Sequence, residues 1–141
     1  MILLPIHPEF VERIRSGEKR FEFRTFVPKG LKDDPLVLVY ATAPEKTIIG
    51  FFRVVSVISC SPTSLWEQAK VGAGISREKY RKYFKGRAKA YALEIAQWKE
   101  LSRPFSVEEL CGRATPPQSF FNLTVEQRQR VLCRAEEGER S

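Results

Sequence analysis

Alternation between hydrophobic and polar positions divides this chain into short strands and short helices. Apolar runs rich in β-branched and aromatic residues predict strands over residues 2–6, 20–26, 36–41, 47–58 and 88–98. Helical spacing of apolar residues predicts one helix after Pro8 that ends at Gly17, and a second helix over residues 77–84. Capping-box patterns place further helix starts at Ser64, Ser106 and Thr124.

This order of elements favours a compact α+β domain built around a small mixed β-barrel. The second, third and fourth strands follow one another with no helix between them, which argues against a doubly wound α/β sheet. Gly50, inside the longest strand, predicts a bulge or a close backbone approach. The glycine-containing segment 71–74 is expected to be a flexible connector.

No linker is long or biased enough to split the chain, so we expect one domain over residues 1–123. Residues 124–141 are expected to add a helix and a mobile tail to that domain. The apolar stripe of this helix, with Val125 and Leu132 on one face, is too short for a stable coiled coil, so we expect it to dock on its own chain. A monomer is therefore favoured, and a dimer stays open.

The segment from Gly17 to Arg24, with the sequence GEKRFEFR, concentrates charge directly after a turn. Lys19, Glu22 and Arg24 fall within six residues, and two phenylalanines alternate with Glu22 and Arg24 along the strand. Such a charged face either meets water or lines an open binding cleft. In a cleft, Arg24 offers a planar fork for a phosphate or a base edge, Lys19 a mobile charge, and Glu22 an acceptor for an exocyclic amino group.

The positive charge of the chain is concentrated in one stretch. The formal net charge is +7, and residues 70–89 contain eight basic residues against one acidic residue, so the rest is neutral. Concentrated positive charge predicts a polyanionic partner, with nucleic acid ahead of acidic lipid, although a solvated basic helix is the alternative. The candidate contacts to a phosphate backbone are Arg77, Arg81, Lys82, Lys85, Arg87 and Lys89.

Several classes of protein are disfavoured by composition. No apolar run approaches the roughly 20 residues that span a bilayer, and no signal peptide is evident, so neither membrane insertion nor secretion is predicted. Three cysteines without CxxC spacing predict free thiols in the cytoplasm. With His7 as the single histidine, we predict no metal and no cofactor, and histidine-based nucleophilic catalysis is open to His7 alone.

The GxKxxExR pattern of residues 17–24 resembles the motif of the ASCH domain, a branch of the PUA-like superfamily. Further agreement with one ASCH subgroup lies in VYATAP, IGFF, SLWE, GIS, YFKG, AYAL and PPQSF, so the likeness spans roughly residues 2–123. The resemblance implies a PUA-like β-barrel with helices closing its ends, and a cleft lined by the motif residues.

The resemblance also implies binding of RNA or of a nucleobase or nucleotide, with a possible regulatory role in transcription or translation. Within such a cleft, Tyr40 and Phe120 are candidates for stacking on a base, although either could be a core residue. Gln118 and Ser119, which follow two prolines, are candidate donors at its rim.

Two alternatives stay open beside this binding module. One is a small hydrolase, an amidohydrolase or a ribonuclease, in which Lys19 acts as nucleophile or base with its pKa lowered by Arg20 or Arg24, and Glu22 carries the proton. In the family members that deacetylate N4-acetylcytidine the catalytic lysine matches Lys19, but threonine replaces Glu22 and the partner glutamate falls near Ala73. We therefore favour binding over turnover. The other alternative is a protein-interaction domain with an acidic partner.

Overall fold

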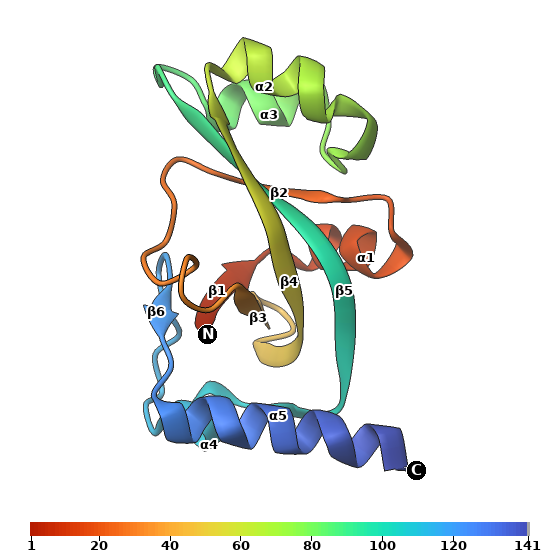
Figure 1. The fold of residues 1–141 in the computed structure, drawn as a ribbon, viewed down its shortest axis with the longest axis vertical. Coiled ribbons are helices and arrows are strands. Elements are labelled where there is room, and N and C mark those ends of the chain that lie inside the picture. The colour runs from red at the N-terminus through yellow and green to blue at the C-terminus, as the bar shows by residue number, and fades with distance from the viewer. Residues whose placement is uncertain (141) are drawn as a thin grey trace. The chain divides into compact units, whose positions relative to one another are not determined.

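The computed structural model describes residues 1–140, with side chains to residue 138 (Figure 1). The elements in order are β1 (Ile2–Ile6), α1 (Pro8–Ser16), β2 (Phe21–Arg24), β3 (Leu36–Ala41), β4 (Thr47–Cys60), α2 (Pro62–Ala69), a 3₁₀ turn (Lys70–Gly72), α3 (Arg77–Tyr83), β5 (Ala90–Phe105), α4 (Val107–Cys111), β6 (Phe121–Asn122) and α5 (Val125–Arg140). None of the helices described is both long enough and apolar enough to cross a membrane.

The strands form one mixed sheet in the order β2-β5-β4-β3-β1-β6. β1 pairs in parallel with β3, so that Ile2 faces Val37, while β1 with β6, β2 with β5 and β3 with β4 pair antiparallel. A mixed sheet with helices outside it confirms the predicted α+β class.

Gly50 marks a close backbone approach, as its position inside a strand predicted. A Cβ atom there would lie 2.5 Å from the carbonyl oxygen of Lys99 and 2.7 Å from the ring of Trp98. The pairing of β3 with β4 also shifts register between Val39 and Tyr40, opposite Gly50. Glycine is required here because any side chain would collide with the neighbouring backbone.

Some predicted boundaries were wrong. Helix α2 is capped by Ser61 rather than Ser64: the backbone N–H of Ser64 donates to Ser61 Oγ at 3.2 Å, and Pro62 fits the first helical position. Strand β5 continues to Phe105, and the two-residue β6 was not predicted. Helix α5 continues to Arg140, where a mobile tail was expected from residue 136.

The chain forms two compact units. The first unit contains Met1–Pro8, Pro28–Arg53 and Gln97–Ser141, and the second contains Glu9–Val27 and Val54–Ala96. Each unit is therefore built from separate stretches of sequence, and β4 and β5 each contribute residues to both.

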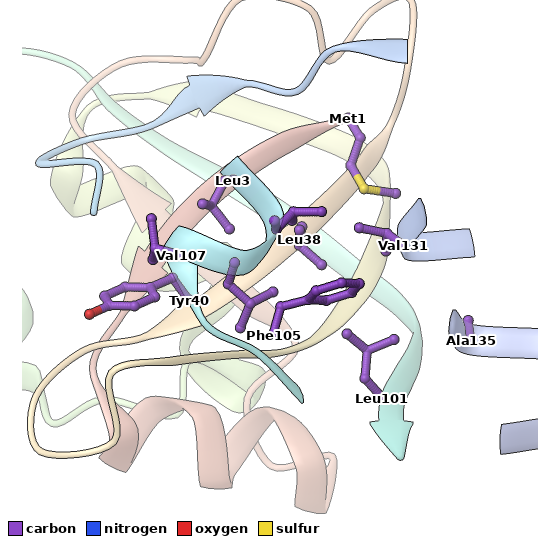
Figure 2. Close-up of a cluster of buried hydrophobic side chains, with 11 residues drawn as sticks. Met1, Leu3, Leu38, Tyr40, Leu101, Phe105, Val107, Val131 and Ala135 are labelled. Atoms are coloured by element: carbon purple, nitrogen blue, oxygen red, sulfur yellow. The ribbon is translucent and has the colours of Figure 1, made fainter. Parts of the chain in front are cut away.

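The core of the first unit joins strands β1, β3 and β5 to helices α4 and α5 (Figure 2). Val131 of α5 is fully buried in this core, so the helix docks on its own chain as expected. Of the predicted docking face, Leu132 packs against this core, whereas Val125 is 86% exposed and does not contribute. The helix begins with the expected reciprocal cap, because Thr124 N donates to Gln127 Oε1 at 2.9 Å and Gln127 N to Thr124 Oγ1 at 3.1 Å.

The core of the second unit is largely aromatic. Phe23 of β2 packs edge-on against Tyr80 and Phe84, with ring centroids 5.0 and 6.3 Å away. Ala90 and Ala92 of β5 are buried beneath these rings, which explains the small residues on that face of the strand. Tyr80 and Phe84 are thus core residues.

Candidate functional site

The charged motif is fixed in place by the turn that precedes it. Helix α1 ends where Gly17 takes a left-handed backbone conformation, with φ of 84°, and its N–H donates to the carbonyl of Ile14 at 3.1 Å. The N–H of Lys19 then returns to the carbonyl of Arg13 at 2.9 Å. Beyond the turn, Glu22 in β2 pairs with Leu93 in β5. The backbone of Lys19 is therefore fixed at the junction between helix α1 and strand β2.

Lys19 is buried, with 2% of its surface exposed. Its Nζ donates a hydrogen bond to the carbonyl oxygen of Ala73 at 2.8 Å. The ammonium group also lies 4.8 Å from the ring centre of Phe23 and 5.3 Å from that of Phe10. The ammonium group of Lys19 thus lies near two aromatic rings and has one backbone hydrogen-bond acceptor.

Burial lowers the pKa of Lys19 below its usual value, because the ammonium form loses its hydration. Glu22 acts in the opposite direction and raises this pKa, while the positive charges of Arg13 and Arg24 lower it further. The sequence predicted a lowering by Arg20 or Arg24. Of these two, Arg24 contributes, and Arg13 from helix α1 takes the place assigned to Arg20.

Glu22 is also buried, with 7% of its surface exposed. Its Oε2 lies 3.9 Å from Nη2 of Arg24, an ion pair longer than a hydrogen bond. The expectation of an open cleft was therefore wrong for Lys19 and Glu22. Both side chains are covered, since Phe10, Phe23 and the segment 72–74 pack around the lysine.

The segment 72–74, which was expected to be a flexible connector, accepts hydrogen bonds from the motif and from helix α1 through three successive carbonyl groups. Gly72 accepts from the N–H of Arg20 at 2.7 Å, Ala73 from Lys19 Nζ, and Gly74 from Arg13 Nη1 at 2.9 Å. Gly74 adopts φ of 60°, and a Cβ atom there would lie 2.4 Å from Cβ of Lys19. Only glycine fits, so the sequence of this segment positions two cations of the site.

Tyr83, at the end of α3, is a site residue that the sequence analysis missed. Burial raises the pKa of its hydroxyl, Arg24 lowers it, Glu22 raises it, and hydrogen bonds with Thr25 lower it. The phenol therefore lies within range of the charges of Glu22 and Arg24. Unlike Tyr80 and Phe84, Tyr83 has 44% of its surface exposed. A polar aromatic ring at the end of a basic helix was the available signal.

The other predicted ligand contacts belong to the first unit. Tyr40 lies in its hydrophobic core with 5% of its surface exposed, so little of its ring is open to a base. Phe120 is half-buried, and Gln118 and Ser119 are exposed. The motif residues Lys19, Glu22 and Arg24, by contrast, gather in the second unit.

The predicted phosphate contacts of the basic segment are all exposed, namely Arg77, Arg81, Lys82, Lys85, Arg87 and Lys89. Lys79 on the same helix is neutralised by Glu9, with Nζ 3.0 Å from Oε1. Lys82 lies 3.8 Å from Glu78. The segment therefore presents positive charge to solvent. Over residues 1–140, no three His, Cys, Asp or Glu side chains gather as a metal-binding group.

Comparison with known proteins gives the context for this site. The family model of the ASCH domain matches residues 4–105. A protein of Zymomonas mobilis described as an ASCH domain-containing ribonuclease is 31% identical over 133 residues, which cover 92% of this chain and 88% of the relative.

Solved structures agree with the family match. The crystal structure of the Zymomonas mobilis ASCH protein has a TM-score of 0.84 at 31% identity, covering 94% of this chain and 93% of the other. A serine-to-alanine variant of that protein has the same TM-score at 30% identity and covers 94% of each chain. The N-terminal domain of McrB from Staphylothermus marinus shares the fold alone, with a TM-score of 0.58 at 13% identity over 94% of this chain and 93% of that one.

Proposed function

Because the chain belongs to the ASCH domain family, we propose that it is an RNA-binding domain with its ligand site at Lys19, Glu22 and Arg24. The observation that carries this proposal is the burial of the two charged groups Lys19 and Glu22 in one small cluster with Arg24. An ammonium group has three donors, and Lys19 makes one hydrogen bond among the described residues. Desolvated charges with bonding capacity left over are costly in a structural role and are typical of ligand sites.

Each side chain has a distinct task in this proposal. Arg24 holds a phosphate or a base edge with its planar guanidinium, and Glu22 accepts from an exocyclic amino group. Lys19 supplies a positive charge, and the hydrogen bond to the carbonyl of Ala73 fixes the position of its ammonium group. Tyr83 adds a phenol near the cluster, and the exposed arginines of α3, Arg77 and Arg81, attract the RNA backbone.

Support for RNA as the ligand comes from two independent sources. The Zymomonas mobilis relative, similar over most of both chains, is described as a ribonuclease. The excess positive charge of this chain lies in one 20-residue stretch that is exposed on the second unit. We further propose a cytoplasmic location, which the three free cysteines support, and a monomeric state.

The test is the affinity for a short fluorescently labelled single-stranded RNA, measured by anisotropy at a fixed salt concentration. Lys19→Met and Arg24→Met should each weaken binding at least tenfold. Lys32→Met, which removes an exposed charge from the first unit, is the matched control and should change the affinity less than twofold. Equal losses in all three variants would show that only net charge matters, and the proposed site would be wrong.

RNA cleavage is a second candidate, favoured by the description of the Zymomonas mobilis relative as a ribonuclease. A lysine with a lowered pKa can act as a base near neutral pH. Neutral Lys19 would remove the proton from a ribose 2′-hydroxyl, the 2′-oxygen would attack the adjacent phosphorus, and the bond to the 5′-oxygen would break. Glu22, in its protonated form, would give a proton to the leaving oxygen.

Incubating the protein with labelled RNA and separating the products on a gel decides between binding and cleavage. Cleavage by this route leaves a 2′,3′-cyclic phosphate on one product and a 5′-hydroxyl on the other. Because this route needs neutral Lys19 and protonated Glu22 together, the rate should fall at both low and high pH, and Lys19→Met should abolish cleavage. Intact RNA with tight binding would leave the chain as a binding domain.

A further inference from the structure

One hollow of the second unit is lined by residues of helices α2 and α3 and of the turn after α3, and by none of the three motif residues. Figure 1 shows these two helices next to each other. The hollow has a volume of about 320 Å³, and its lining includes three aromatic side chains, Trp66, Tyr80 and Phe84, and three arginines, Arg77, Arg81 and Arg87. The one acidic residue of the lining, Glu67, is paired with Lys70 at 2.9 Å, and Pro62 and Thr63 complete the lining. We infer that this pocket, called here the α2–α3 pocket, binds one unstacked base of single-stranded RNA while its arginines hold the flanking phosphates.

The aromatic floor of the pocket is rigid. Tyr80 donates its hydroxyl hydrogen to the carbonyl oxygen of Pro62 at 2.7 Å, which fixes its ring and satisfies its polar atom. The ring centroids of Trp66 and Phe84 lie 4.8 and 4.9 Å from that of Tyr80. Tyr80 and Phe84 are almost fully buried, whereas Trp66 is half-buried. Trp66 thus offers the aromatic surface on which a base can stack.

The arginines around the pocket differ from the lysines of the same helix. Lys79 pairs with Glu9 at 3.0 Å, and Lys82 lies 3.8 Å from Glu78. Within residues 1–140, by contrast, Arg81 and Arg87 form no ion pair, and both are exposed. Like charges gathered around one hollow repel one another, so an anionic ligand would relieve that repulsion.

The identity of these cations also matters. Arginine presents a planar fork that matches two phosphate oxygens, whereas lysine acts as a point charge. Arg77 and Arg81 lie four residues apart and share one face of α3. The pocket therefore combines a stacking surface with phosphate-binding forks, a combination typical of sites for single-stranded nucleic acid.

The size of the pocket limits what it can accept. A volume of about 320 Å³ lies at the lower end of the range for ligand pockets, about 300 to 1,000 Å³. That suits a single nucleotide unit rather than a duplex. An acidic protein segment could satisfy the arginines but would leave the aromatic surface of Trp66 without a planar partner.

The inference rests on the proposed function in taking RNA as the ligand, and it adds a contact outside the motif. The first experiment compares two double variants that remove the same charge from the same seven residues. Arg81→Gln with Arg87→Gln changes the pocket, and Lys82→Gln with Lys85→Gln changes its exposed surroundings. The arginine variant should lose at least tenfold in RNA affinity and flatten the plot of log K against log salt by about 1.4, or about 0.7 for each phosphate contact. The lysine variant should lose less than threefold.

The second experiment reports on stacking directly. In a Trp98→Phe background, Trp66 is the remaining tryptophan, so its fluorescence reports on the pocket. Binding of a short RNA should quench this fluorescence, an oligonucleotide of abasic ribose phosphates should not, and the arginine double variant should reduce the quenching. Equal quenching by polyglutamate would instead identify an acidic protein as the occupant and overturn the inference.

The two proposals fail in different ways. One outcome is that RNA binds, that Lys19→Met weakens this binding, and that the two double variants lose the same affinity. In that case the α2–α3 pocket is overturned and the motif site stands. Loss of affinity in the arginine variant with no effect of Lys19→Met would leave the pocket and remove the motif site. If the wild-type chain binds no RNA, both proposals are wrong.

Discussion

Two groups of charged side chains, one in each unit, show opposite effects of their surroundings. In the first unit, Asp34 accepts from Arg128 Nε at 2.7 Å and from the N-terminal amino group of Met1. Burial acts to raise the pKa of Asp34, but these partners and the N–H of Leu36 outweigh it and lower the pKa to about 2. In the second unit, Lys19 lies near Glu22, and its pKa is nevertheless lowered.

The fold stabilises the ionised form of Asp34, whereas it disfavours the ionised form of Lys19. Asp34 has opposite charges as direct hydrogen-bond partners, so its ionised form is favoured. Lys19 has lost water and has two arginines nearby, and one carboxylate does not offset both effects. A structural ion pair and a candidate binding site can therefore be told apart by the direction of the pKa shift together with the bonding geometry.

The largest effect on stability is expected from Asp34→Asn. A carboxyl group with a pKa lowered from 3.8 to about 2 stabilises the folded state by about 2 kcal/mol above pH 4, and this is lost as the pH falls through 2. Urea unfolding of wild type and variant should show this gap at pH 7 and a much smaller gap near pH 2. The variant should bind RNA with wild-type affinity, and a loss of binding would remove the contrast between the two groups.

A smaller loss of stability is expected from Arg128→Lys, which keeps a positive charge beside Asp34 but removes the planar guanidinium group. Arg128 meets both carboxylate oxygens, with Nε at 2.7 Å and Nη2 at 3.4 Å, and lysine cannot reproduce that geometry. We expect a loss of about 1 kcal/mol in the free energy of unfolding. Arg53→Lys, an exposed change in the same unit, is the control, and an equal loss there would contradict the role of the fork.

The smallest effect on stability is expected from Lys19→Met, because two contributions oppose each other. Methionine loses the hydrogen bond to Ala73 but removes a buried charge, so the net change at pH 7 should stay within about 1 kcal/mol. Since the pKa of Lys19 is lowered by folding, the wild-type chain binds fewer protons folded than unfolded. Wild type should therefore gain stability relative to the variant as the pH rises from the lowered pKa towards 10.5. If the stability of wild type relative to the variant instead fell over that range, the fold would stabilise the ammonium form of Lys19.

Most of the fold could be predicted from local patterns, because those patterns report on burial within a single element. The continuous apolar run of residues 36–41 is the buried strand β3, and Ser76 caps α3 through the N–H of Lys79. The cap of α2 was misplaced by three residues because Ser64, followed by Glu67, fits the capping box, whereas Ser61 is marked as the cap only by Pro62 at the first helical position.

The sequence identified the residues of the candidate site but not the surroundings in which they lie. The motif named Lys19, Glu22 and Arg24, and these residues do gather in one unit. The burial of Lys19 depends on the carbonyl of Ala73, 54 residues further along the chain, and no local pattern encodes that contact. The influence of Glu22 and Arg24 on Tyr83 likewise depends on how α3 packs within the second unit.

The interleaving of the two units sets the order in which the chain can fold during synthesis. All residues of the second unit, including the candidate site, have been made once Ala96 is added. The first unit begins with Met1 yet needs Val131 of the last helix to fill its core. Strand β1, made first, must therefore wait for the last part of the chain, and its apolar residues stay available to chaperones or to aggregation in that interval.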